Sequence, residues 1–358
     1  MVKTSMRITK KPLSSLTKDI LENPGFGIHF SDHMFSAEYE AGQWQRPEIM
    51  PFGDMSISPA MCTLHYGQAV FEGLKAFHAE DGTINLFRID KYHSRFQRSS
   101  RRLCIPEVSY DLFRDGLTEL VKLDREWVPR RKGYALYIRP FIFATDNYLG
   151  VRVSETYRFL IITSPVGAYY KEGMNPVRLV TSGEYVRAAR GGLGEAKTPA
   201  NYAASILPAE EAKKRGFTQV LWLDAVERRY VEEVGTMNIF FVIGDELVTP
   251  SLDGSVLAGV TRDSVIQLAR HWGMKVVERR ISIDELIAAS SAGTLKEAFG
   301  TGTAATISPV GEICHNDKKI VINGFKTGEF AKKAYDYLAG VSSGTGPDEF
   351  GWRYVIRP

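Results

Sequence analysis

The sequence is poor in cysteine and has no long apolar segment. Its three cysteines, Cys62, Cys104 and Cys314, are far apart and match no metal-binding spacing. So few thiols are typical of a reducing cytoplasm, where disulfides are rare. No apolar run approaches the roughly 18 residues of a membrane span, and the basic N-terminus lacks the apolar core of a secretory signal. We therefore expect a cytoplasmic protein without a membrane partner, whose N-terminal residues form a solvated arm.

The sequence also lacks a strong excess of one charge, since its net charge is only +3 and no basic run is long. The sequence therefore gives no sign of a nucleic-acid partner. With 358 residues, 44% of them hydrophobic, the chain is long enough for two domains with substantial cores. We expect a smaller domain at residues 1–165, a Gly- and Pro-rich linker at 166–176, and a larger domain at 177–358.

Hydrophobic periodicity and turn residues predict strands and helices in both halves of the chain. Strands are expected at residues 33–40, 84–87, 135–144, 157–163, 177–181, 219–224, 235–243 and 275–281. Helices are expected at residues 90–103, 110–127, 257–270, 283–289 and 327–339. This mixture, with strands and helices alternating in the second half, predicts an α/β (α+β) protein.

The most informative lysine is Lys197, which follows a turn with three glycines in four residues and precedes an Ala-rich segment. It has three interpretations: a solvated surface lysine, the lysine of a phosphate-binding loop G-x-x-x-x-G-K-[ST], and a lysine that forms a Schiff base with a carbonyl such as that of pyridoxal 5'-phosphate. The phosphate-binding loop is disfavoured because Ala196 replaces its second glycine and Pro199 follows at once. This segment alone does not decide among them.

Two other segments suggest that the protein binds anions. Arg139 follows Tyr137 by two residues in an apolar segment, so both side chains should share one face of a strand. An arginine there needs an anion, which either an internal salt bridge or a carboxylate substrate could supply. Residues 257–270 turn from a glycine into a helix, a geometry in which backbone N–H groups and the helix dipole receive a phosphate.

Seven motifs together resemble the branched-chain-amino-acid aminotransferases, which are fold-type IV enzymes dependent on pyridoxal 5'-phosphate. In the family's order, between residues 64 and 304, they are L-H-Y-G-Q-A-V-F-E-G-L-K-A-F, L-Y-I-R-P, S-P-V-G-A-Y, K-T-P-A-N-Y, E-V-G-T-M-N-I-F, L-A-G-V-T-R and F-G-T-G-T-A. The resemblance implies the two-domain fold-type IV architecture and favours the Schiff-base lysine. It also implies reversible amino transfer between leucine, isoleucine or valine and 2-oxoglutarate, giving the branched 2-oxo acid and glutamate.

Matching the motifs residue by residue gives the implied cofactor site. Lys197 resembles the catalytic lysine that forms the Schiff base and carries the proton. Glu233 is similar to the carboxylate that pairs with the pyridine nitrogen, and Tyr202 to the tyrosine beside the ring's phenolic oxygen. The implied phosphate-binding groups are Arg95, Thr303 and the backbone N–H groups of Val260 and Thr261. No metal is implied.

The implied substrate site must accept both an apolar and an anionic side chain. Arg139 would meet the glutamate γ-carboxylate, while the α-carboxylate would rest on Tyr137 and on the N–H groups of Thr303 and Ala304. The implied aromatic walls are Tyr66, Phe71, Tyr169 and Tyr202. Leu149 and Val151 resemble a loop that a neighbouring subunit contributes, which implies at least a homodimer.

The sequence departs from the vertebrate members of this family at one pair of positions. Ala305 and Ser308 stand where those members carry a redox C-x-x-C, so we expect no thiol regulation of that form. A second interpretation is another fold-type IV enzyme, either a D-amino-acid aminotransferase or an aminodeoxychorismate lyase. A nucleotide-binding protein with a phosphate-binding loop is the alternative from a different class.

Overall fold

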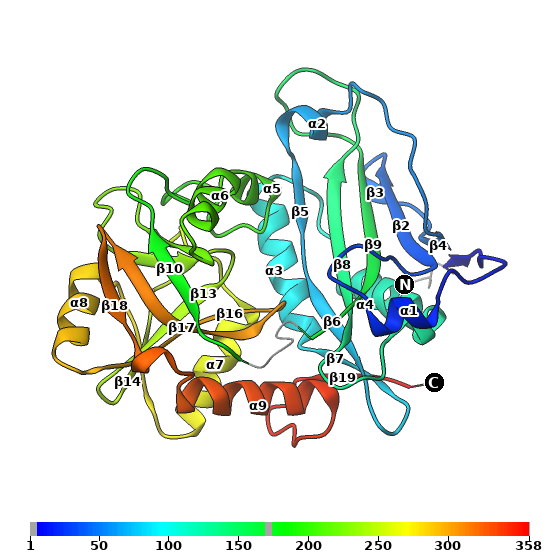
Figure 1. The fold of residues 1–358 in the computed structure, drawn as a ribbon. Coiled ribbons are helices and arrows are strands. Elements are labelled where there is room, and N and C mark those ends of the chain that lie inside the picture. Colours follow the sequence, from blue (N-terminus) through cyan, green and yellow to red (C-terminus); the bar gives the residue numbers. More distant parts are fainter. Residues whose placement is uncertain (1–5, 169–173, 358) are drawn as a thin grey trace. The chain divides into compact units, whose positions relative to one another are not determined.

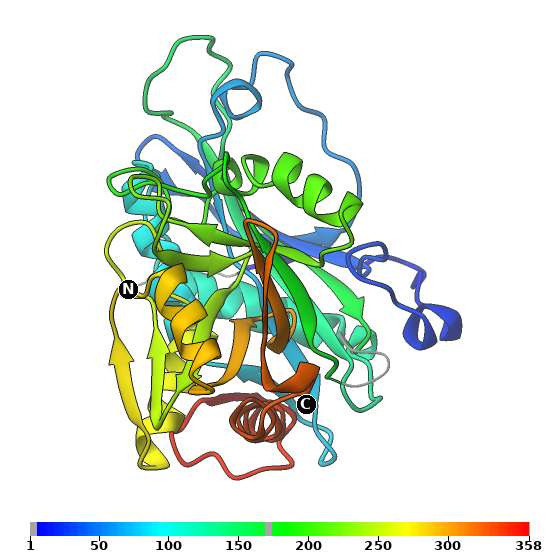
Figure 2. The ribbon, with the colours of Figure 1, turned by 60° about the vertical axis from the view of Figure 1, so that its left-hand side comes forward.

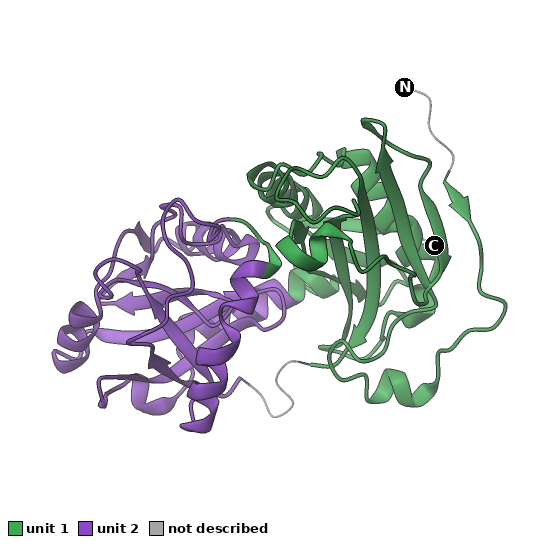
Figure 3. Ribbon diagram, turned by 90° about the horizontal axis from the view of Figure 1, so that it is seen from above, with its two compact units in different colours: residues 1–169, 196–199, 340–358 green, residues 170–195, 200–339 purple. Residues whose placement is uncertain are grey.

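The computed structural model describes residues 6–168 and 174–357, and its elements are labelled in Figure 1. The chain divides into two compact units, coloured separately in Figure 3: unit 1 comprises residues 1–169, 196–199 and 340–358, and unit 2 comprises 170–195 and 200–339. The division expected from sequence assigned 340–358 to the second domain. In the structure this segment groups with unit 1 because β19 (Arg353–Ile356) pairs with β7 (Ile84–Phe87). The predicted linker lies partly outside the described residues and stays a prediction.

Within the described part of unit 1, ten strands form one sheet. Its order is β1-β4-β2-β9-β8-β6-β7-β19, with β3 beside β2 and β5 beside β8. Besides β7 and β19, the strands are β1 (Arg7–Ile8), β2 (His33–Glu40), β3 (Gln43–Trp44), β4 (Glu48–Pro51), β5 (Ala69–Phe71), β6 (Leu74–His78), β8 (Ala135–Ala144) and β9 (Tyr157–Val166). The helices are α1 (Lys18–Glu22), α2 (Cys62–Tyr66), α3 (Ile89–Arg102), α4 (Tyr110–Leu123) and the 3-10 helix η1 (Arg125–Trp127).

Strand β8 is the central element of unit 1, and Figure 1 shows it running beside β9. Leu136, Ile138 and Ile142 are fully buried, whereas Tyr137 and Arg139 are half-buried. Because successive side chains of a strand point to opposite faces, the apolar set enters the core and the tyrosine and arginine share the other face. The sequence prediction for this strand and this face agrees with the structure.

An aromatic cluster holds α4 against the sheet of unit 1. Phe113 of α4 stacks on Phe159 of β9, with ring centroids 6.2 Å apart, and Phe35 of β2 meets Phe159 edge to face at 5.4 Å. Gly116 of α4 makes this approach possible, because a Cβ atom there would lie 2.7 Å from the Phe35 ring. Close packing of these aromatic rings therefore holds α4 on the face of the sheet that carries Phe35 and Phe159.

The described part of unit 2 holds a nine-stranded sheet of order β12-β11-β10-β17-β16-β13-β14-β15, with β18 beside β17. The strands are β10 (Val177–Thr181), β11 (Gln219–Leu223), β12 (Val231–Val234), β13 (Asn238–Ile243), β14 (Glu246–Thr249), β15 (Lys275–Glu278), β16 (Leu295–Gly302), β17 (Thr306–His315) and β18 (Lys318–Val321). The helices are α5 (Pro199–Ala203), α6 (Ile206–Lys214), α7 (Val260–His271), α8 (Ile283–Ser291), η2 (Asn323–Phe325) and α9 (Glu329–Ser343), of which α5 begins and α9 ends in unit 1. Figure 2 shows the β17–β18 hairpin, and α8 packs against β16 and β18.

Several predicted elements match the structure to the residue, namely 33–40, 84–87 and 135–144. The helix predicted at 110–127 is divided, because α4 ends at Leu123 and η1 follows. The side chain of Asp124 accepts a hydrogen bond from the His33 backbone N–H at 3.0 Å and lies 2.6 Å from its ring nitrogen Nδ1. That buried partner fixes Asp124 at the helix end.

The strand predicted at 235–243 begins only at Asn238. Gly235 has a φ of 53°, and Val234 and Met237 close a tight turn through two backbone hydrogen bonds. A glycine in the left-handed region is typical of a turn, which the apolar pattern alone does not reveal. This turn separates β12 from β13 and brings Glu233 near Asn238.

Candidate active site

Lys197 is held in unit 1 by both of its backbone groups. Its N–H donates to Oγ of Ser99 on α3 at 2.9 Å, and its carbonyl accepts from the N–H of Phe71, the last residue of β5, at 3.0 Å. Its Nζ atom lies 4.7 Å from the centroid of the Phe71 ring. A lysine with a fixed backbone and an amine against an aromatic face differs from a solvated surface lysine.

Arg139 also contacts the ring of Phe71. Its guanidinium carbon is 4.8 Å from the Phe71 centroid and 5.3 Å from the Tyr137 centroid, and Nη2 donates to the Tyr137 hydroxyl at 3.2 Å. Among the described residues no carboxylate forms an ion pair with Arg139, and its buried Nε makes no hydrogen bond. The internal salt bridge considered from the sequence is therefore not found, and the guanidinium can still bind an anion.

Arg95 is buried on α3 and pairs with a residue that the sequence reasoning did not select. Its Nε and Nη2 donate to the two carboxylate oxygens of Glu72, each at 2.7 Å, and Glu72 is fully buried. Arg95 and Ser99 are four residues apart, so they share one face of α3. The same helix face thus carries the arginine expected to bind phosphate and the hydroxyl that holds Lys197.

In unit 2, Glu233 is 3% exposed and surrounded by donors. Its Oε1 accepts from the side-chain amide of Asn238 at 3.0 Å and from the backbone N–H of Leu257 at 3.1 Å. Its Oε2 lies 2.7 Å from Nε of Arg187, forming a buried ion pair. Glu233 is therefore a buried carboxylate with neutral donors at Oε1 and a cation beside Oε2.

The neighbouring carboxylate, Glu232, has a different environment. Its Oε1 accepts from the Ser255 hydroxyl at 2.5 Å, while its buried Oε2 has no hydrogen-bond partner. Burial is the largest influence on Glu232 and raises its pKa above the ordinary value. The two carboxylates therefore accept hydrogen bonds from different donors, as expected for adjacent residues of a strand, although the charge of Arg187 acts on both.

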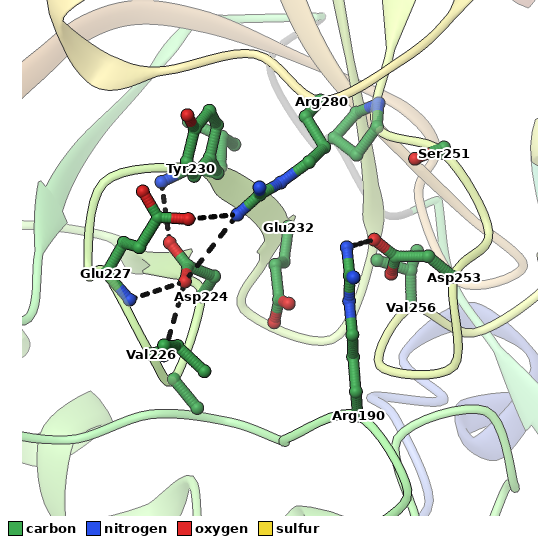
Figure 4. Close-up of a pocket in the computed structure, with 13 residues that line it drawn as sticks. Arg190, Asp224, Val226, Glu227, Tyr230, Glu232, Ser251, Asp253, Val256 and Arg280 are labelled. Carbon is green, nitrogen blue, oxygen red and sulfur yellow. Dashed lines mark hydrogen bonds and ion pairs between the residues drawn. The ribbon is translucent and has the colours of Figure 1, made fainter.

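Glu232 also lines a pocket of about 180 Å³ within unit 2, shown in Figure 4. Residues that line it form ion pairs with each other: Arg190 binds Asp253, and Arg280 binds Glu227 at 3.0 Å. None of the predicted site residues lines this pocket. Apart from Glu232, the charged side chains that line it are paired with one another.

The N-terminus of α7 provides the predicted phosphate-binding backbone. Val260 and Thr261 are its first two residues, and Gly259 caps it without a side-chain hydrogen bond. A Cβ atom on Gly259 would overlap with Oδ1 of Asn238, so a larger residue there would displace this partner of Glu233. The first N–H groups of a helix have no partner within the helix, and the dipole favours an anion there.

Thr303 and Ala304 lie in a tight turn between β16 and β17. Gly302 pairs with Thr306, and residue 306 has a φ of 64°, as in hairpins whose short loop ends in a left-handed residue. Residues 297–302, which lead into this turn, are the end of strand β16. Thr303 and Ala304 are therefore at the tip of this hairpin. Tyr202, another predicted site residue, lies half-buried on α5.

Tyr66 and Leu149 meet within unit 1, since the Tyr66 hydroxyl donates to the Leu149 carbonyl. Leu149 is 64% and Val151 86% exposed, which is unusual for apolar side chains. Tyr169 lies outside the described residues. Its predicted role stays a prediction.

The structure adds three buried polar residues around the predicted set, namely Arg187, Asn238 and Glu72. Their sequence signals were weak: Asn238 follows a turn in G-T-M-N, and Arg187 stands among other arginines in Y-V-R-A-A-R. In residues 6–168 and 174–357, no group of three His, Cys, Asp or Glu side chains could hold a metal ion. Over the same ranges, the helices are all too short or too polar to cross a membrane.

Comparison with known proteins places these features in context. The model of the family "Amino-transferase class IV" matches residues 69–313. The chain is 51% identical over 352 residues to branched-chain-amino-acid aminotransferase 2 of Bacillus subtilis, covering 98% of this chain and 96% of the relative. Among solved structures, it resembles the branched-chain amino acid aminotransferase of Escherichia coli with a TM-score of 0.75 and 25% identity, over 91% of this chain and 99% of the other. It also resembles the T.th. branched-chain amino acid aminotransferase with pyridoxamine 5'-phosphate, with a TM-score of 0.74 and 27% identity over 90% of this chain and 98% of the other.

Proposed function

The chain belongs to the class IV aminotransferases, and from this premise we propose that it transfers amino groups between branched-chain amino acids and 2-oxoglutarate. The products would be the branched 2-oxo acid and glutamate, and the reaction would run in both directions. The fold is the mixed α/β fold of fold-type IV aminotransferases. The relatives named as branched-chain aminotransferases support the substrate class.

The cofactor of this family is pyridoxal 5'-phosphate, and the residues present fit it. In unit 2, Glu233 is a buried carboxylate that could bind a protonated ring nitrogen. The first N–H groups of α7, at Val260 and Thr261, could bind a phosphate. Thr303 and Tyr202 would complete the set in this unit. Unit 1 offers the amine of Lys197 and the buried guanidinium of Arg95.

When bound, the cofactor supplies an electron sink for the carbanion formed at the substrate α-carbon. In the proposed reaction the amine of Lys197 is the group that takes the α-proton and returns it. The Glu233 carboxylate holds a proton at the ring nitrogen, which keeps the ring able to accept electrons. Arg187, Asn238 and the Leu257 N–H hold that carboxylate in place.

One observation carries the substrate assignment: Lys197 Nζ and the Arg139 guanidinium both contact the ring of Phe71. An aromatic wall suits a branched apolar side chain, and an arginine without a carboxylate partner suits the γ-carboxylate of glutamate. The same wall therefore offers contacts to both kinds of substrate. Tyr137 and Arg139 line one face of β8, with Tyr66 on α2 and Tyr169 proposed as further wall residues.

Two measurements on the purified protein test this proposal. The first is an absorption spectrum, in which a visible band that borohydride removes indicates a cofactor bound to a lysine. The second is steady-state kinetics with glutamate as donor and a series of 2-oxo acids. We expect kcat/KM for the leucine, isoleucine and valine oxo acids to exceed that for pyruvate at least tenfold. Preference for a D-amino acid donor, or pyruvate release from aminodeoxychorismate, would instead assign the chain to another branch of the fold type.

Assembly and location belong to the same proposal. The exposed Leu149 and Val151 support a homodimer in which this loop reaches the partner's substrate site, where Thr303 and Ala304 would hold the α-carboxylate. Its small-molecule substrates and sparse cysteines fit the cytoplasm. No nucleic-acid or membrane partner is part of this proposal.

A further inference from the structure

Arg187 is a buried arginine that none of the family motifs quoted above contains. Its side chain is 7% exposed, as is typical only of arginines with firm partners. It contacts three segments of unit 2: its Nε lies 2.7 Å from Oε2 of Glu233, and its Nη2 donates to the carbonyls of Gly194 (3.3 Å) and Ser255. One guanidinium thus joins the glycine-rich segment before Lys197, the loop before α7, and β12.

These contacts have an electrostatic consequence for Glu233. A carboxylate that is 3% exposed pays a large desolvation cost for its charge and takes up a proton unless a cation or several donors compensate. Asn238 and Leu257 donate to Oε1, so Arg187 is the charged partner of Oε2. Replacing Arg187 by an apolar side chain removes this positive charge from beside Oε2.

The contacts also have a geometric consequence. Gly194 and Ser255 lie against each other, since a Cβ atom on Gly194 would overlap with the Ser255 carbonyl. Both carbonyls accept from Nη2, so they fix the guanidinium plane and with it the direction from which Nε approaches Glu233. The orientation of the carboxylate is therefore coupled to the glycine-rich segment.

We propose that Arg187 is a positioning residue that keeps Glu233 ionised and oriented, so that this carboxylate can bind the protonated ring nitrogen of the cofactor. The inference rests on the proposed function, because it takes Glu233 as the partner of that nitrogen. Arg187 itself does not touch substrate or cofactor in this scheme. It acts only through Glu233.

The test is a double-mutant cycle on the holoenzyme that measures cofactor affinity rather than turnover. Pyridoxal 5'-phosphate binding is measured by equilibrium dialysis for wild type, Arg187→Met, Glu233→Gln and the double variant. We expect Arg187→Met to weaken binding roughly 10- to 100-fold, as for the loss of a buried charged partner. In the Glu233→Gln background the same change should weaken binding by less than about threefold, because the group on which it acts is already neutral.

Arg190→Met is the matched control, since Arg190 is three residues away, is 56% exposed in its side chain and pairs with Asp253 at the surface. It should bind the cofactor like wild type. Arg187→Lys keeps the charge and should recover binding to within about tenfold of wild type, a rescue that a purely packing role would not give. If Arg187→Met does not fold, Arg187→Gln, which also removes the charge, gives the same cycle.

Equal losses of affinity in both backgrounds would overturn the inference, since Arg187 would then act independently of Glu233. So would binding by Arg187→Met that equals that of Arg190→Met. A different result identifies failure of the proposed function: wild type would then bind no pyridoxal 5'-phosphate, or would not aminate branched 2-oxo acids. The two failures are therefore distinguishable.

Discussion

The backbone of Lys197 is held by hydrogen bonds to Ser99 and Phe71, and its side-chain amine lies against the Phe71 ring. Replacing it with Ala should therefore remove the amine while leaving the hydrogen bonds to Ser99 and Phe71 intact. We expect Lys197→Ala to abolish turnover and the visible band of the lysine-bound cofactor, with a thermal midpoint close to that of wild type. Absorption spectra and differential scanning calorimetry check this. Near-native activity in this variant would contradict the whole assignment.

Glu233 is the residue through which the ring nitrogen would stay protonated. Glu233→Gln should keep the cofactor bound, more weakly, and lower kcat, because a neutral amide cannot stabilise the proton on the nitrogen. Single-turnover rates of α-proton removal measure this directly. Glu232→Gln is the control, since Glu232 accepts from Ser255 instead. If the Glu232 change were the more damaging one, the assignment of the nitrogen partner would be off by one residue.

Arg139 sits between two aromatic rings without a carboxylate partner among the described residues, and this predicts a selective effect of its loss. Arg139→Met should lower kcat/KM for glutamate and 2-oxoglutarate by roughly 10- to 100-fold, about 1.5–3 kcal/mol for a charged pair. Leucine and its oxo acid should change much less, because Phe71 and Tyr137 remain. Kinetics of both half-reactions decide this, and an equal loss for both substrate classes would remove Arg139 from the substrate site.

Gly259 stands directly before helix α7 and leaves room for the Asn238 side chain. Gly259 has a φ of −66°, so alanine is not excluded by the backbone conformation. Its Cβ would instead displace the Asn238 side chain, which donates to Glu233 at 3.0 Å and to the Leu257 carbonyl at 2.8 Å.

Gly259→Ala should therefore weaken pyridoxal 5'-phosphate binding about tenfold or more, through both the helix start and the Glu233 support. Cofactor titration followed by absorbance measures the affinity. Gly273→Ala tests a glycine beyond the other end of α7, where a Cβ meets no atom within 4 Å. Because Gly273 has a φ of 77°, alanine there should lower the stability of the fold without weakening cofactor binding. Equal affinity losses in the two variants would contradict this explanation.

The contrast between β8 and the Glu233 region shows what the sequence can predict about elements. Residues 135–144 are rich in apolar and aromatic side chains, and Tyr137 and Arg139 are two residues apart, so the strand, its boundaries and the face of Arg139 followed from local pattern. The partners of Glu233 did not, because Arg187 and Leu257 come from segments far from it in sequence, and Asn238 reaches it only through the tight turn after β12. Long-range pairing of polar groups has no local signature.

The same limit explains the errors near chain ends and turns. Residues 353–356 have a short β-branched and aromatic pattern, but only their pairing with β7 makes them a strand of unit 1. Roles such as those of Lys197 and Glu233 came from the family motifs and not from local chemistry. The Glu72–Arg95 pair was missed because a glutamate in F-E-G-L-K-A-F carries no sign of its partner 23 residues later.

At the scale of the whole molecule, residues 147–153 form an exposed apolar loop in unit 1. Tyr148, Leu149, Val151 and Val153 are 46%, 64%, 86% and 52% exposed. The loop is nevertheless fixed: Arg152 pairs with Asp146 and Glu155, each at 3.0 Å, and the Leu149 carbonyl accepts from Tyr66. An ordered segment that leaves adjacent apolar side chains in water is typical of an interaction surface.

The proposed homodimer gives this loop its partner and predicts what a charge would do there. The double variant Leu149→Asp/Val151→Asp should keep its backbone contacts, since these involve the Leu149 carbonyl and Arg152 rather than the substituted side chains. Light scattering should show a dimer for wild type and a shift toward monomer for the variant. Its specific activity should fall on dilution, because each substrate site would lose the neighbour's loop. Val226→Asp is the control, since Val226 is 89% exposed in the other unit and should leave mass and activity unchanged. A fully active wild-type monomer, or a double variant that behaves like Val226→Asp, would show that the loop belongs to a single chain.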